Sequence, residues 1–413
     1  MINVKSGRLA IQPYPEQLNI AFPTWRFRMN KLFPWNRHLA QIAFISLFIF
    51  TTFLEAWAVN SKESHPIPFI VGADVTMQTK VEQAGGVFKI NGKQEDAFKI
   101  LRHFGFNTIR LRIFNHPSGQ GPMCCDLNYD IALAKRAKSE GFNILLDFHY
   151  SDTWADPDHQ QIPEAWHNLD FEGLKTALYD YSKAVITAFR KNGVSPEIIQ
   201  CGNEVNTGML WPDGRTDSPD GWRRFAQLVQ AAEDGCRAAL PPGYPILFLH
   251  HIAGASSVIW HMTNFIKYGG ALPDIIGVSY YPCWHGNLVV LKKNLDQIVD
   301  KYHIPVLIVE TDYPWTDETF DSTPDIWHGK PLNGMPPFTP YGQAEFYTEL
   351  INTLKSLPNR MGLGFVTWEP TWLPSKRFGS SQDNLTLFDQ HGNALPALEA
   401  IRDAIGSNTS VSK

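Results

Sequence analysis

The sequence predicts an α/β fold, a closed (β/α)8 TIM barrel, on three observations. From residue 68 onward, short runs rich in β-branched residues alternate with longer amphipathic segments, and eight of each can be placed. Glu204 and Glu310 each follow such an apolar run, and they stand 106 positions apart. A barrel takes about 250 residues, or roughly 31 per βα unit, so this spacing is a little over three units. No glycine-rich phosphate loop follows any expected strand, which favours the barrel over the alternative, a doubly wound open sheet.

The expected strands leave room for a helix after each of them. They cover residues 69–74, 108–114, 143–149, 198–203, 246–250, 275–280, 306–310 and 364–368. Residues 129–141 illustrate the helices, since apolar side chains recur at helical spacing and Gly141 provides the usual stop. Glu204 would end the fourth strand and Glu310 the seventh. Both are therefore expected on the C-terminal rim, where barrel enzymes place their chemistry.

A single folded domain is expected, flanked by short segments. The expected boundaries are an N-terminal extension with signal peptide at 1–58, a linker at 59–67, the barrel at 68–405 and a tail at 406–413.

The N-terminal extension contains an apolar run at residues 39–54. Its 16 residues are few for a membrane span of about 20 but suit the apolar region of a secretory signal peptide. Ala56-Trp57-Ala58 then offers a small-x-small cleavage sequence. The alternative is an uncleaved signal anchor, because 38 residues precede the run. In either case we expect the barrel to be exported, as a secreted or membrane-anchored protein.

Composition excludes several classes of function. The chain has 36 basic and 41 acidic residues, a net charge of −5 and no Lys/Arg run, which argues against a nucleic-acid partner. Its five cysteines lack paired metal-ligand spacing, so we expect no metal. Adjacent Cys124 and Cys125 could pair with other cysteines, but the connectivity stays open. Aromatic residues make up 13% of the chain, with 13 Trp, a composition that suits stacking on sugar rings.

Polar and aromatic side chains gather where the expected strands end. This clustering is what a barrel active site predicts, because the loops after the strands carry the chemistry. The candidates are Asp74, Arg110, Arg112, His149, Asp152, Trp154, Asn203, Tyr281, Trp284, His285, Trp368 and Trp372. They surround Glu204 and Glu310, which are expected on the same rim. Two carboxyl groups on one rim are the minimum that glycoside hydrolysis requires.

Several blocks along nearly all of residues 68–400 resemble glycoside hydrolase family 53, the arabinogalactan endo-β-1,4-galactanases of clan A. The blocks are GADV (72–75), NTIRLRIF (107–114), DFHYSDTWADP (147–157), GNEVNTGMLWPDG (202–214), IIGVSYYPCWHG (275–286), VETDYP (309–314) and WEPTW (368–372). The third and fourth are long and specific, whereas GADV alone is weak. The sequence departs from the family pattern at 114–117 and in the long loop 315–340, which affects the sugar subsites rather than the chemistry.

The resemblance implies a role for each catalytic residue. Glu204 would be the general acid/base and Glu310 the nucleophile of a retaining mechanism, with carboxyls about 5 to 5.5 Å apart. The negative charge of Glu310 would raise the pKa of Glu204, so that Glu204 starts the reaction protonated. Formation of the glycosyl-enzyme would remove that charge, and Glu204 could then ionise. Asn203 would bind the sugar 2-hydroxyl, and Arg110 or Arg112 would hold Glu310 ionised.

The remaining candidates would shape the sugar-binding site. His149, Asp152 and Tyr281 would line it, and Trp284, Trp368 and Trp372 would serve as sugar platforms. The resemblance further implies an enzyme that acts on the β-1,4-galactan side chains of pectin without a cofactor. Together with the N-terminal segment this predicts a secreted enzyme, and we expect it to be a monomer with no protein partner.

Two alternatives stay open at this stage. A clan-related glycanase would keep the mechanism but cleave mannan or a glucan. A carbohydrate-binding pseudoenzyme held on a surface by residues 39–54 would bind without turnover, although retention of both Glu204 and Glu310 speaks against it. Such a pseudoenzyme would bind galactan equally well after Glu310→Ala.

Overall fold

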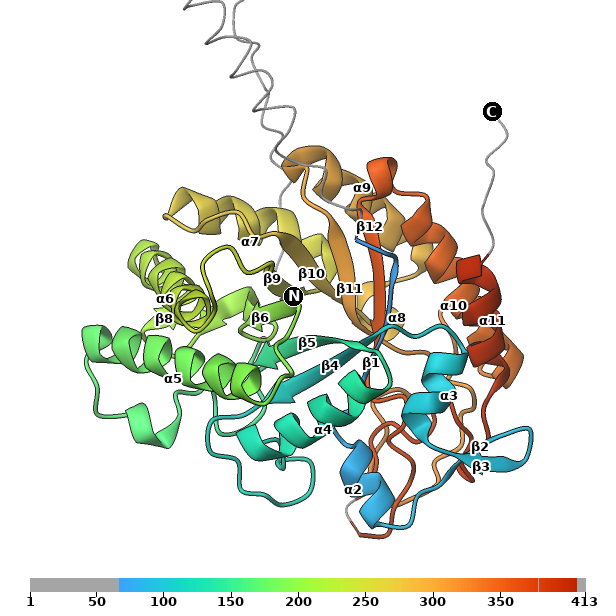
Figure 1. The fold of residues 1–413 in the computed structure, drawn as a ribbon. Helices are drawn as coiled ribbons and strands as arrows, with labels where there is room; N and C mark the ends of the chain where they lie inside the picture. Colours follow the sequence, from blue (N-terminus) through green and yellow to red (C-terminus); the bar gives the residue numbers. More distant parts are fainter. Residues whose placement is uncertain (1–66, 378, 407–413) are drawn as a thin grey trace, which may run out of the picture. The chain divides into compact units, whose positions relative to one another are not determined.

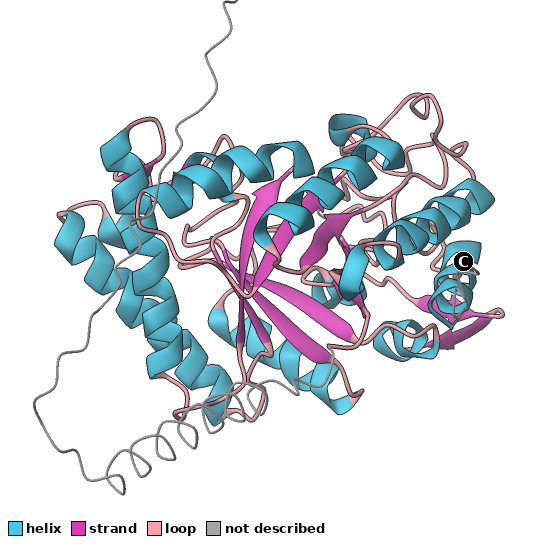
Figure 2. Cartoon of the chain, turned by 90° about the horizontal axis from the view of Figure 1, so that it is seen from above, coloured by secondary structure: helices cyan, strands magenta, loops and turns pink. Residues whose placement is uncertain are grey.

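The computed structural model describes residues 67–377 and 379–406. Within them, eight parallel strands close into a barrel in the order β1-β4-β5-β6-β9-β10-β11-β12, with β12 pairing with β1 again. The strands occupy the centre and helices surround them (Figures 1 and 2). The predicted (β/α)8 barrel is confirmed. The expected extension 1–58, residues 59–66 and residues 407–413 lie outside the described residues, so their boundaries stay predictions.

The barrel strands lie within a few residues of the predicted ranges. They are β1 (Ile70–Asp74), β4 (Thr108–Ile113), β5 (Asn143–Phe148), β6 (Ile198–Cys201), β9 (Leu247–Ala253), β10 (Ile275–Tyr280), β11 (Val306–Thr311) and β12 (Gly362–Thr367). Two small hairpins lie outside the barrel, formed by β2 (Phe88–Ile90) with β3 (Lys93–Glu95) and by β7 (Gly208–Met209) with β8 (Gly214–Arg215). β6 is thus the fourth barrel strand and β11 the seventh, as the spacing predicted.

Helices fill the connections between the strands. They are α2 (Gln78–Gln83), α3 (Ala97–His103), α4 (Leu127–Ser139), α5 (Phe171–Lys191), α6 (Pro219–Ala238), α7 (Ala255–Lys267), α8 (Pro282–His285), α9 (Leu288–Tyr302), α10 (Pro340–Lys355) and α11 (Pro396–Gly406). Short 3-10 turns are η1 (Glu164–Trp166), η2 (Val205–Thr207) and η3 (Pro358–Arg360).

Local sequence explains where the long helices begin. The side chains of Asp126, Asp170 and Ser218 accept hydrogen bonds from backbone N–H groups in the first turns of α4, α5 and α6. Such a cap satisfies a donor that has no partner within the helix and contributes about 1 kcal/mol. Pro219 follows the cap of α6, where its missing N–H costs nothing.

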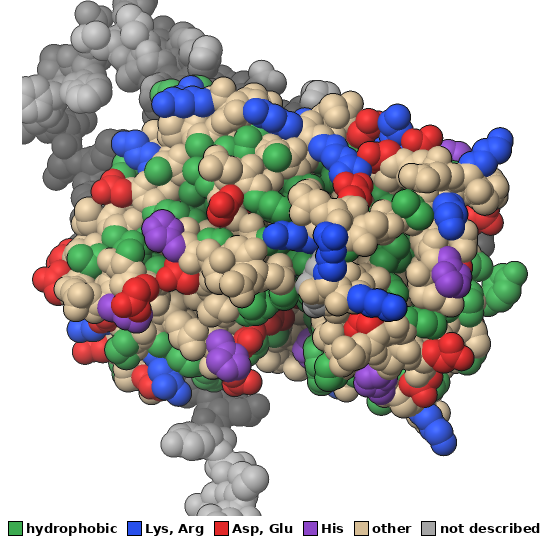
Figure 3. All heavy atoms as spheres, turned by 90° about the horizontal axis from the view of Figure 1, so that it is seen from below, with side chains coloured by type: hydrophobic (Ala, Val, Ile, Leu, Met, Phe, Trp, Pro, Cys, Tyr) green, Lys and Arg blue, Asp and Glu red, His purple; other side chains and the backbone are tan. Residues whose placement is uncertain are grey.

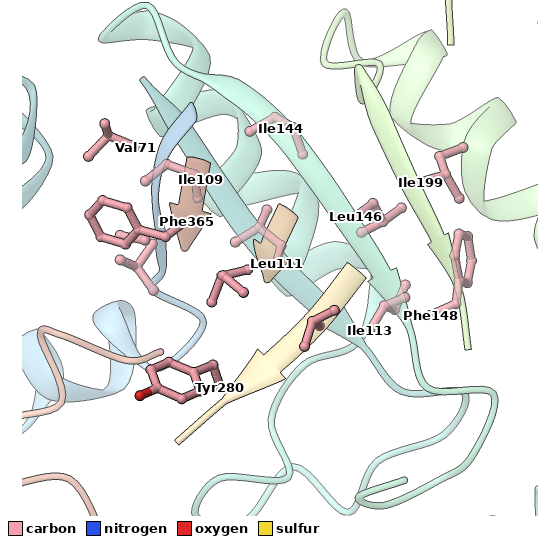
Figure 4. Packing of buried hydrophobic residues seen from close by; sticks show 14 of the residues in the cluster. Val71, Ile109, Leu111, Ile113, Ile144, Leu146, Phe148, Ile199, Tyr280 and Phe365 are labelled. Carbon is pink, nitrogen blue, oxygen red and sulfur yellow. The ribbon is translucent and has the colours of Figure 1, made fainter. Parts of the chain in front are cut away.

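Alternation along each strand divides the core into two layers. Val71, Ile109, Leu146 and Phe365 belong to the large cluster that packs against the helices (Figure 4). The intervening positions face the barrel axis, and a second cluster fills it with Ile70, Leu145, Ile198, Leu249, Ile275, Leu307, Val309 and Leu363. Because the period of a strand is two, the same alternation decides which polar side chains point into the barrel.

Polar side chains replace the apolar ones toward the C-terminal end of the barrel axis. On β4 the inward positions are Thr108, Arg110 and Arg112, all buried. Asp147 follows Leu145 two residues later on β5, and Gln200 follows Ile198 on β6. The apolar base of the barrel therefore supports a polar layer directly beneath the C-terminal rim.

None of the helices in the described part of the chain is long and apolar enough to cross a membrane. The apolar run 39–54 lies outside that part. On the face shown in Figure 3, basic side chains are interspersed with acidic and hydrophobic ones.

Candidate active site

A cavity of about 230 Å³ opens at the C-terminal rim of the barrel. Its lining brings together residues from five strand ends and one long loop, namely His149, Trp154, Ala155, Asp156, Asn203, Glu204, Tyr281, Trp284, Glu310, Ile326 and Trp368. The two predicted catalytic carboxyls share this cavity, although 106 positions separate them in the sequence.

Glu310 reaches the cavity because β11 contains one extra residue. Val278 of β10 pairs with Ile308, but the next residue, Ser279, pairs with Glu310, and a matching shift separates β11 from β12. Val309 belongs to the apolar cluster on the barrel axis. A bulge of this kind re-aims a side chain, so that the consecutive residues Val309 and Glu310 both point inward.

The Glu310 carboxylate has two close partners. Arg110 Nη2 lies 2.7 Å from its Oε1, and the Tyr281 hydroxyl donates to its Oε2 at 3.0 Å. Burial raises the pKa of Glu310 above its ordinary value, whereas Arg110 and the Tyr281 hydrogen bond lower it. The interactions within hydrogen-bonding distance thus favour the charged form of Glu310.

Arg110 is the centre of a buried ion-pair network. Its guanidinium contacts Asp74 at 2.9 Å, Asp147 at 2.8 Å and the Asn203 amide oxygen at 2.9 Å, in addition to Glu310. Burial disfavours the charge of Asp147, but Arg110 and His149 outweigh it, and the pKa of Asp147 is lowered. One cation therefore fixes three carboxylates and the amide next to Glu204.

Glu204 lies in a strained turn after β6. Its backbone is left-handed (φ 45°, ψ 54°), a conformation that costs a non-glycine residue on the order of 1 kcal/mol or more and is often found at functional sites. Its Oε1 accepts a hydrogen bond of 2.5 Å from the hydroxyl of Ser279. The partner of Glu204 is therefore neutral, in contrast to the cation beside Glu310.

This difference decides which carboxyl carries a proton. Burial and the charge of Glu310 raise the pKa of Glu204 to about 8, against the weaker effects of Ser279 and Arg110. Two interacting carboxyls titrate as a pair and hold a first proton at the site where the negative charge is less stabilised. Because Arg110 contacts Glu310 directly, the shared proton lies on Glu204.

Arg112 serves a second buried network rather than Glu310. Its Nη1 lies 2.7 Å from Glu369 and 3.2 Å from Asp74, and its guanidinium stacks over Trp154 at 4.5 Å from the ring centroid. Of the two arginines that the sequence proposed as partners of Glu310, Arg110 takes that role. Arg112 supports the floor beneath Trp154 and Trp368.

His149 and Asn203 line the cavity and are held by the same network. His149 Nε2 lies 3.1 Å from Asp147, and its Nδ1 accepts from the Ala155 N–H. Asn203 accepts from Arg110 through its amide oxygen and donates to the Ala155 carbonyl at 2.8 Å.

The predicted aromatic platforms differ in exposure. Trp284 is 62% exposed, and it lines the cavity together with Trp154 and Trp368. Trp372 is only 4% exposed, and its indole N–H donates to the Gly379 carbonyl. It contacts Trp368 edge to face at 6.3 Å and does not line the cavity. Trp372 therefore supports Trp368 and does not serve as the sugar platform that the sequence predicted.

Two other predicted residues lie outside the cavity. Asp152 accepts hydrogen bonds from the backbone N–H groups of His116 and Glu164, so it joins two loops. His285 Nδ1 accepts from the Tyr281 N–H, and burial lowers its pKa to about 4. Both side chains hold loops that carry cavity residues. Asp74 is likewise buried beneath the cavity as a partner of the two arginines.

The prediction of site residues missed several members of the polar layer. They are Asp147, Asp156, Gln200, His251, Ser279 and Glu369, of which Asp156 lines the cavity and the others contact its lining residues or the arginines beneath them. The strand period was a usable signal, because Asp147, Gln200, His251 and Ser279 all stand at inward positions.

The described residues contain no group of three or more His, Cys, Asp or Glu side chains placed to hold a metal ion. A larger groove, of about 610 Å³, lies on the outer surface beside α5 and α6. Its lining carries a single carboxylate, Asp234, so it lacks the catalytic pair. The smaller cavity at the rim, which holds both predicted carboxyls, is therefore the candidate active site.

Residues 70–401 match the sequence profile described as glycosyl hydrolase family 53. The chain belongs to glycosyl hydrolase family 53. An uncharacterized protein from the bgaB 5' region of Niallia circulans is 37% identical over 83% of this chain and 95% of its own length. An arabinogalactan endo-β-1,4-galactanase of Cellvibrio japonicus is 34% identical over 84% of this chain and 94% of its own.

A solved structure supports the same assignment. The family 53 catalytic domain from Ignisphaera aggregans is 33% identical, covers 82% of this chain and 97% of its own, and superposes with a TM-score of 0.76. This member of family 53 is therefore a glycoside hydrolase with a TIM-barrel fold, as the motifs predicted.

Proposed function

We propose that this protein is a retaining endo-β-1,4-galactanase that cleaves the galactan side chains of pectic arabinogalactan. The observation that carries the proposal is the pair of carboxyls on one cavity with opposite surroundings. Glu310 contacts the Arg110 guanidinium at 2.7 Å, whereas Glu204 accepts from a neutral hydroxyl. This asymmetry supplies one ionised and one protonated carboxyl, as the first step of glycoside hydrolysis requires.

In the first step Glu310 attacks the anomeric carbon and Glu204 donates its proton to the leaving oxygen. Arg110 and Tyr281 hold both oxygens of Glu310, so the carboxylate enters the reaction in a fixed orientation. A retaining mechanism requires carboxyls about 5 to 5.5 Å apart, and Glu204 and Glu310 line the same cavity. Asn203, beside Glu204, would donate to the 2-hydroxyl of the sugar.

In the second step Glu204 acts as a base. Esterification of Glu310 removes the negative charge that raises the pKa of Glu204. Glu204 then ionises and takes a proton from the water that attacks the glycosyl-enzyme. The same residue therefore serves as acid and then as base, because the charge of its neighbour changes between the steps.

The substrate assignment rests on the relatives and on the aromatic lining. The Cellvibrio japonicus relative carries the name arabinogalactan endo-β-1,4-galactanase. Trp154, Trp284 and Trp368 offer ring faces beside the carboxyls, which suits the apolar faces of a sugar chain. The apolar run 39–54 supports export of the protein, and we propose that it acts outside the cell as a monomer without a cofactor.

The test is release of reducing sugar from linear β-1,4-galactan, with β-mannan and carboxymethylcellulose as alternative polymers. Wild-type protein is compared with Glu310→Ala and with Glu399→Ala, a control in α11 outside the cavity. We expect galactan cleavage that Glu310→Ala abolishes and Glu399→Ala preserves. Preferential cleavage of another polymer would refute the substrate, and binding without turnover would indicate a pseudoenzyme.

Stereochemistry tests the mechanism separately. Proton NMR of a galactan oligosaccharide during cleavage should show the β-anomer as the first product. Initial appearance of the α-anomer would refute the two-step mechanism and the assignment of Glu310 as nucleophile. N-terminal sequencing of protein from the culture medium tests export, and a retained residue 1 would exclude cleavage after Ala58.

A further inference from the structure

A chain of buried hydrogen bonds leads from Glu204 across the inside of the barrel. The Ser279 hydroxyl donates to Glu204 Oε1 at 2.5 Å, and the same oxygen of Ser279 lies 2.7 Å from His251 Nε2. Ser279 is in β10 and His251 in β9, and both have exposures of 0%. Glu204 follows the end of β6, and β6, β9 and β10 are neighbours in the barrel.

The surroundings of His251 set the direction of these hydrogen bonds. Its Nδ1 faces two donors, the Glu204 backbone N–H at 3.3 Å and the Gln200 amide nitrogen at 2.9 Å. Gln200 gives one amide hydrogen to Asp147 at 2.6 Å, and an amide nitrogen cannot accept, so its contact with Nδ1 is a hydrogen bond only if Nδ1 accepts. The Asn203 amide oxygen also lies 3.0 Å from Nδ1, but it already accepts from Arg110 at 2.9 Å. Nδ1 therefore faces two hydrogen-bond donors and one acceptor that is already hydrogen-bonded, so Nδ1 acts as an acceptor.

A neutral imidazole with an unprotonated Nδ1 carries its hydrogen on Nε2. Burial and the Arg110 charge lower the pKa of His251 well below its ordinary value, with Asp147 opposing and His149 adding to the shift. His251 Nε2 therefore donates to Ser279, and the Ser279 hydroxyl can only pass its own hydrogen to Glu204 Oε1. The donor roles form one directed chain, His251 to Ser279 to Glu204.

We propose that Ser279 and His251 are positioning residues that keep Glu204 Oε1 as an acceptor and so confine the catalytic proton to Oε2. The inference rests on the proposed role of Glu204 as the general acid. A proton on Oε1 would face the Ser279 hydroxyl inside the barrel and could not reach a leaving group in the cavity. Confining it to one oxygen makes every protonated Glu204 productive.

The neutral character of the chain is essential to this role. A cation at the position of Ser279 would also orient the carboxyl, but it would hold Glu204 ionised, as Arg110 does for Glu310. The charged groups that act on Glu204 from the other packed elements are Glu310, Arg110 and Asp156. A hydroxyl fixed by a neutral imidazole orients the acid while leaving it protonated at neutral pH.

The test compares Ser279→Ala with wild-type protein and with Ser182→Ala. Ser182 is an equally buried serine in α5 that bonds to Tyr150 and to the Leu178 carbonyl, and it controls for loss of a buried hydroxyl outside the site. Ser279→Thr restores the hydroxyl. The substrates are aryl β-galactobiosides whose phenols range from good to poor leaving groups, because only poor ones need the proton of the acid.

We expect Ser279→Ala to lower kcat/KM roughly tenfold for poor leaving groups and to change it less than about threefold for good ones. The basic limb of its pH profile should move up by about one unit, since a hydrogen bond that stabilises the ionised carboxyl is lost. Ser279→Thr should restore both properties, and Ser182→Ala should leave both unchanged.

Two results would overturn the inference. One is an equal loss for good and poor leaving groups with an unchanged basic limb. The other is a His251 ring whose nitrogen-15 shifts show the hydrogen on Nδ1. If wild-type protein cleaves no glycoside, the proposed function fails instead. The hydrogen-bond chain from His251 through Ser279 to Glu204 is then still tested by a carbon-13 NMR titration of Glu204, whose pKa should rise in Ser279→Ala.

Discussion

Replacing Tyr281 by Phe would remove one hydroxyl from the nucleophile and leave the ring in place. That hydroxyl donates to Glu310 Oε2 at 3.0 Å, and both residues are buried. The ring packs edge to face against Trp284 at 5.3 Å and would keep that contact. The substitution therefore isolates a single hydrogen bond to the reacting carboxylate.

The size of the effect follows from the charge of the acceptor. A hydrogen bond to an ionised group contributes about 1.5 to 3 kcal/mol, which equals roughly one to two pKa units. The bond lowers the pKa of Glu310, so its loss raises that pKa. Because Glu310 must be ionised to attack, activity rises with pH through this pKa, and the acidic limb of kcat/KM should move up by about one unit or more.

The assay is the pH dependence of kcat/KM on a soluble galactan oligosaccharide, together with thermal unfolding. At pH values below the new limb, Tyr281→Phe should be roughly 10- to 100-fold slower than wild type. The free energy of unfolding should fall by about 1.5 to 3 kcal/mol and no more, because buried Glu310 loses one hydrogen bond while the ring still fills its site. An acidic limb at the wild-type position would refute the argument that Tyr281 stabilises the charge of Glu310.

Further predictions concern the acid and the platforms. Glu204→Ala should lower kcat on galactan by about 10²- to 10⁴-fold, and azide should restore turnover of an activated aryl galactobioside by intercepting the glycosyl-enzyme; no rescue would contradict its role. Wild-type kcat/KM should fall as the pH rises through about 8, where Glu204 loses its proton, and a profile still flat well above that value would contradict the pKa shift. Trp284→Ala should raise KM for galactan and change the free energy of unfolding by about 0.5 kcal/mol or less, because Trp284 is exposed. Trp372→Ala should lower the free energy of unfolding by about 3 to 5 kcal/mol, because Trp372 is buried. Denaturant unfolding measures both values, and equal stabilities would contradict the different exposures of the two residues.

The sequence alone determined the barrel and its two carboxyls. The eight strands could be placed because β-branched runs of period two are a local property, and each predicted range overlaps its strand. Glu204 and Glu310 could be assigned to the rim because barrel units have a nearly constant length. Both arguments depend on spacing along the chain, which folding preserves.

The tertiary structure decided what each rim residue contacts. Arg110 and Arg112 have the same residue type and the same inward orientation, and only the register of the neighbouring strands gives Glu310 to one and Glu369 to the other. The extra residue in β11, which turns Glu310 inward, leaves no local mark in the sequence VLIVET.

Burial likewise separated residues that looked equivalent. Trp284 and Trp372 both follow strand ends, yet one is exposed beside the cavity and the other donates its indole hydrogen to a buried carbonyl. Ser279 lies in one of the family blocks and His251 in none, and neither is marked as a partner of Glu204 by its sequence neighbours; they matter because neighbouring strands bring them to Glu204. Distances across a barrel depend on every strand at once, so a residue's chemical environment cannot be obtained from its sequence neighbours.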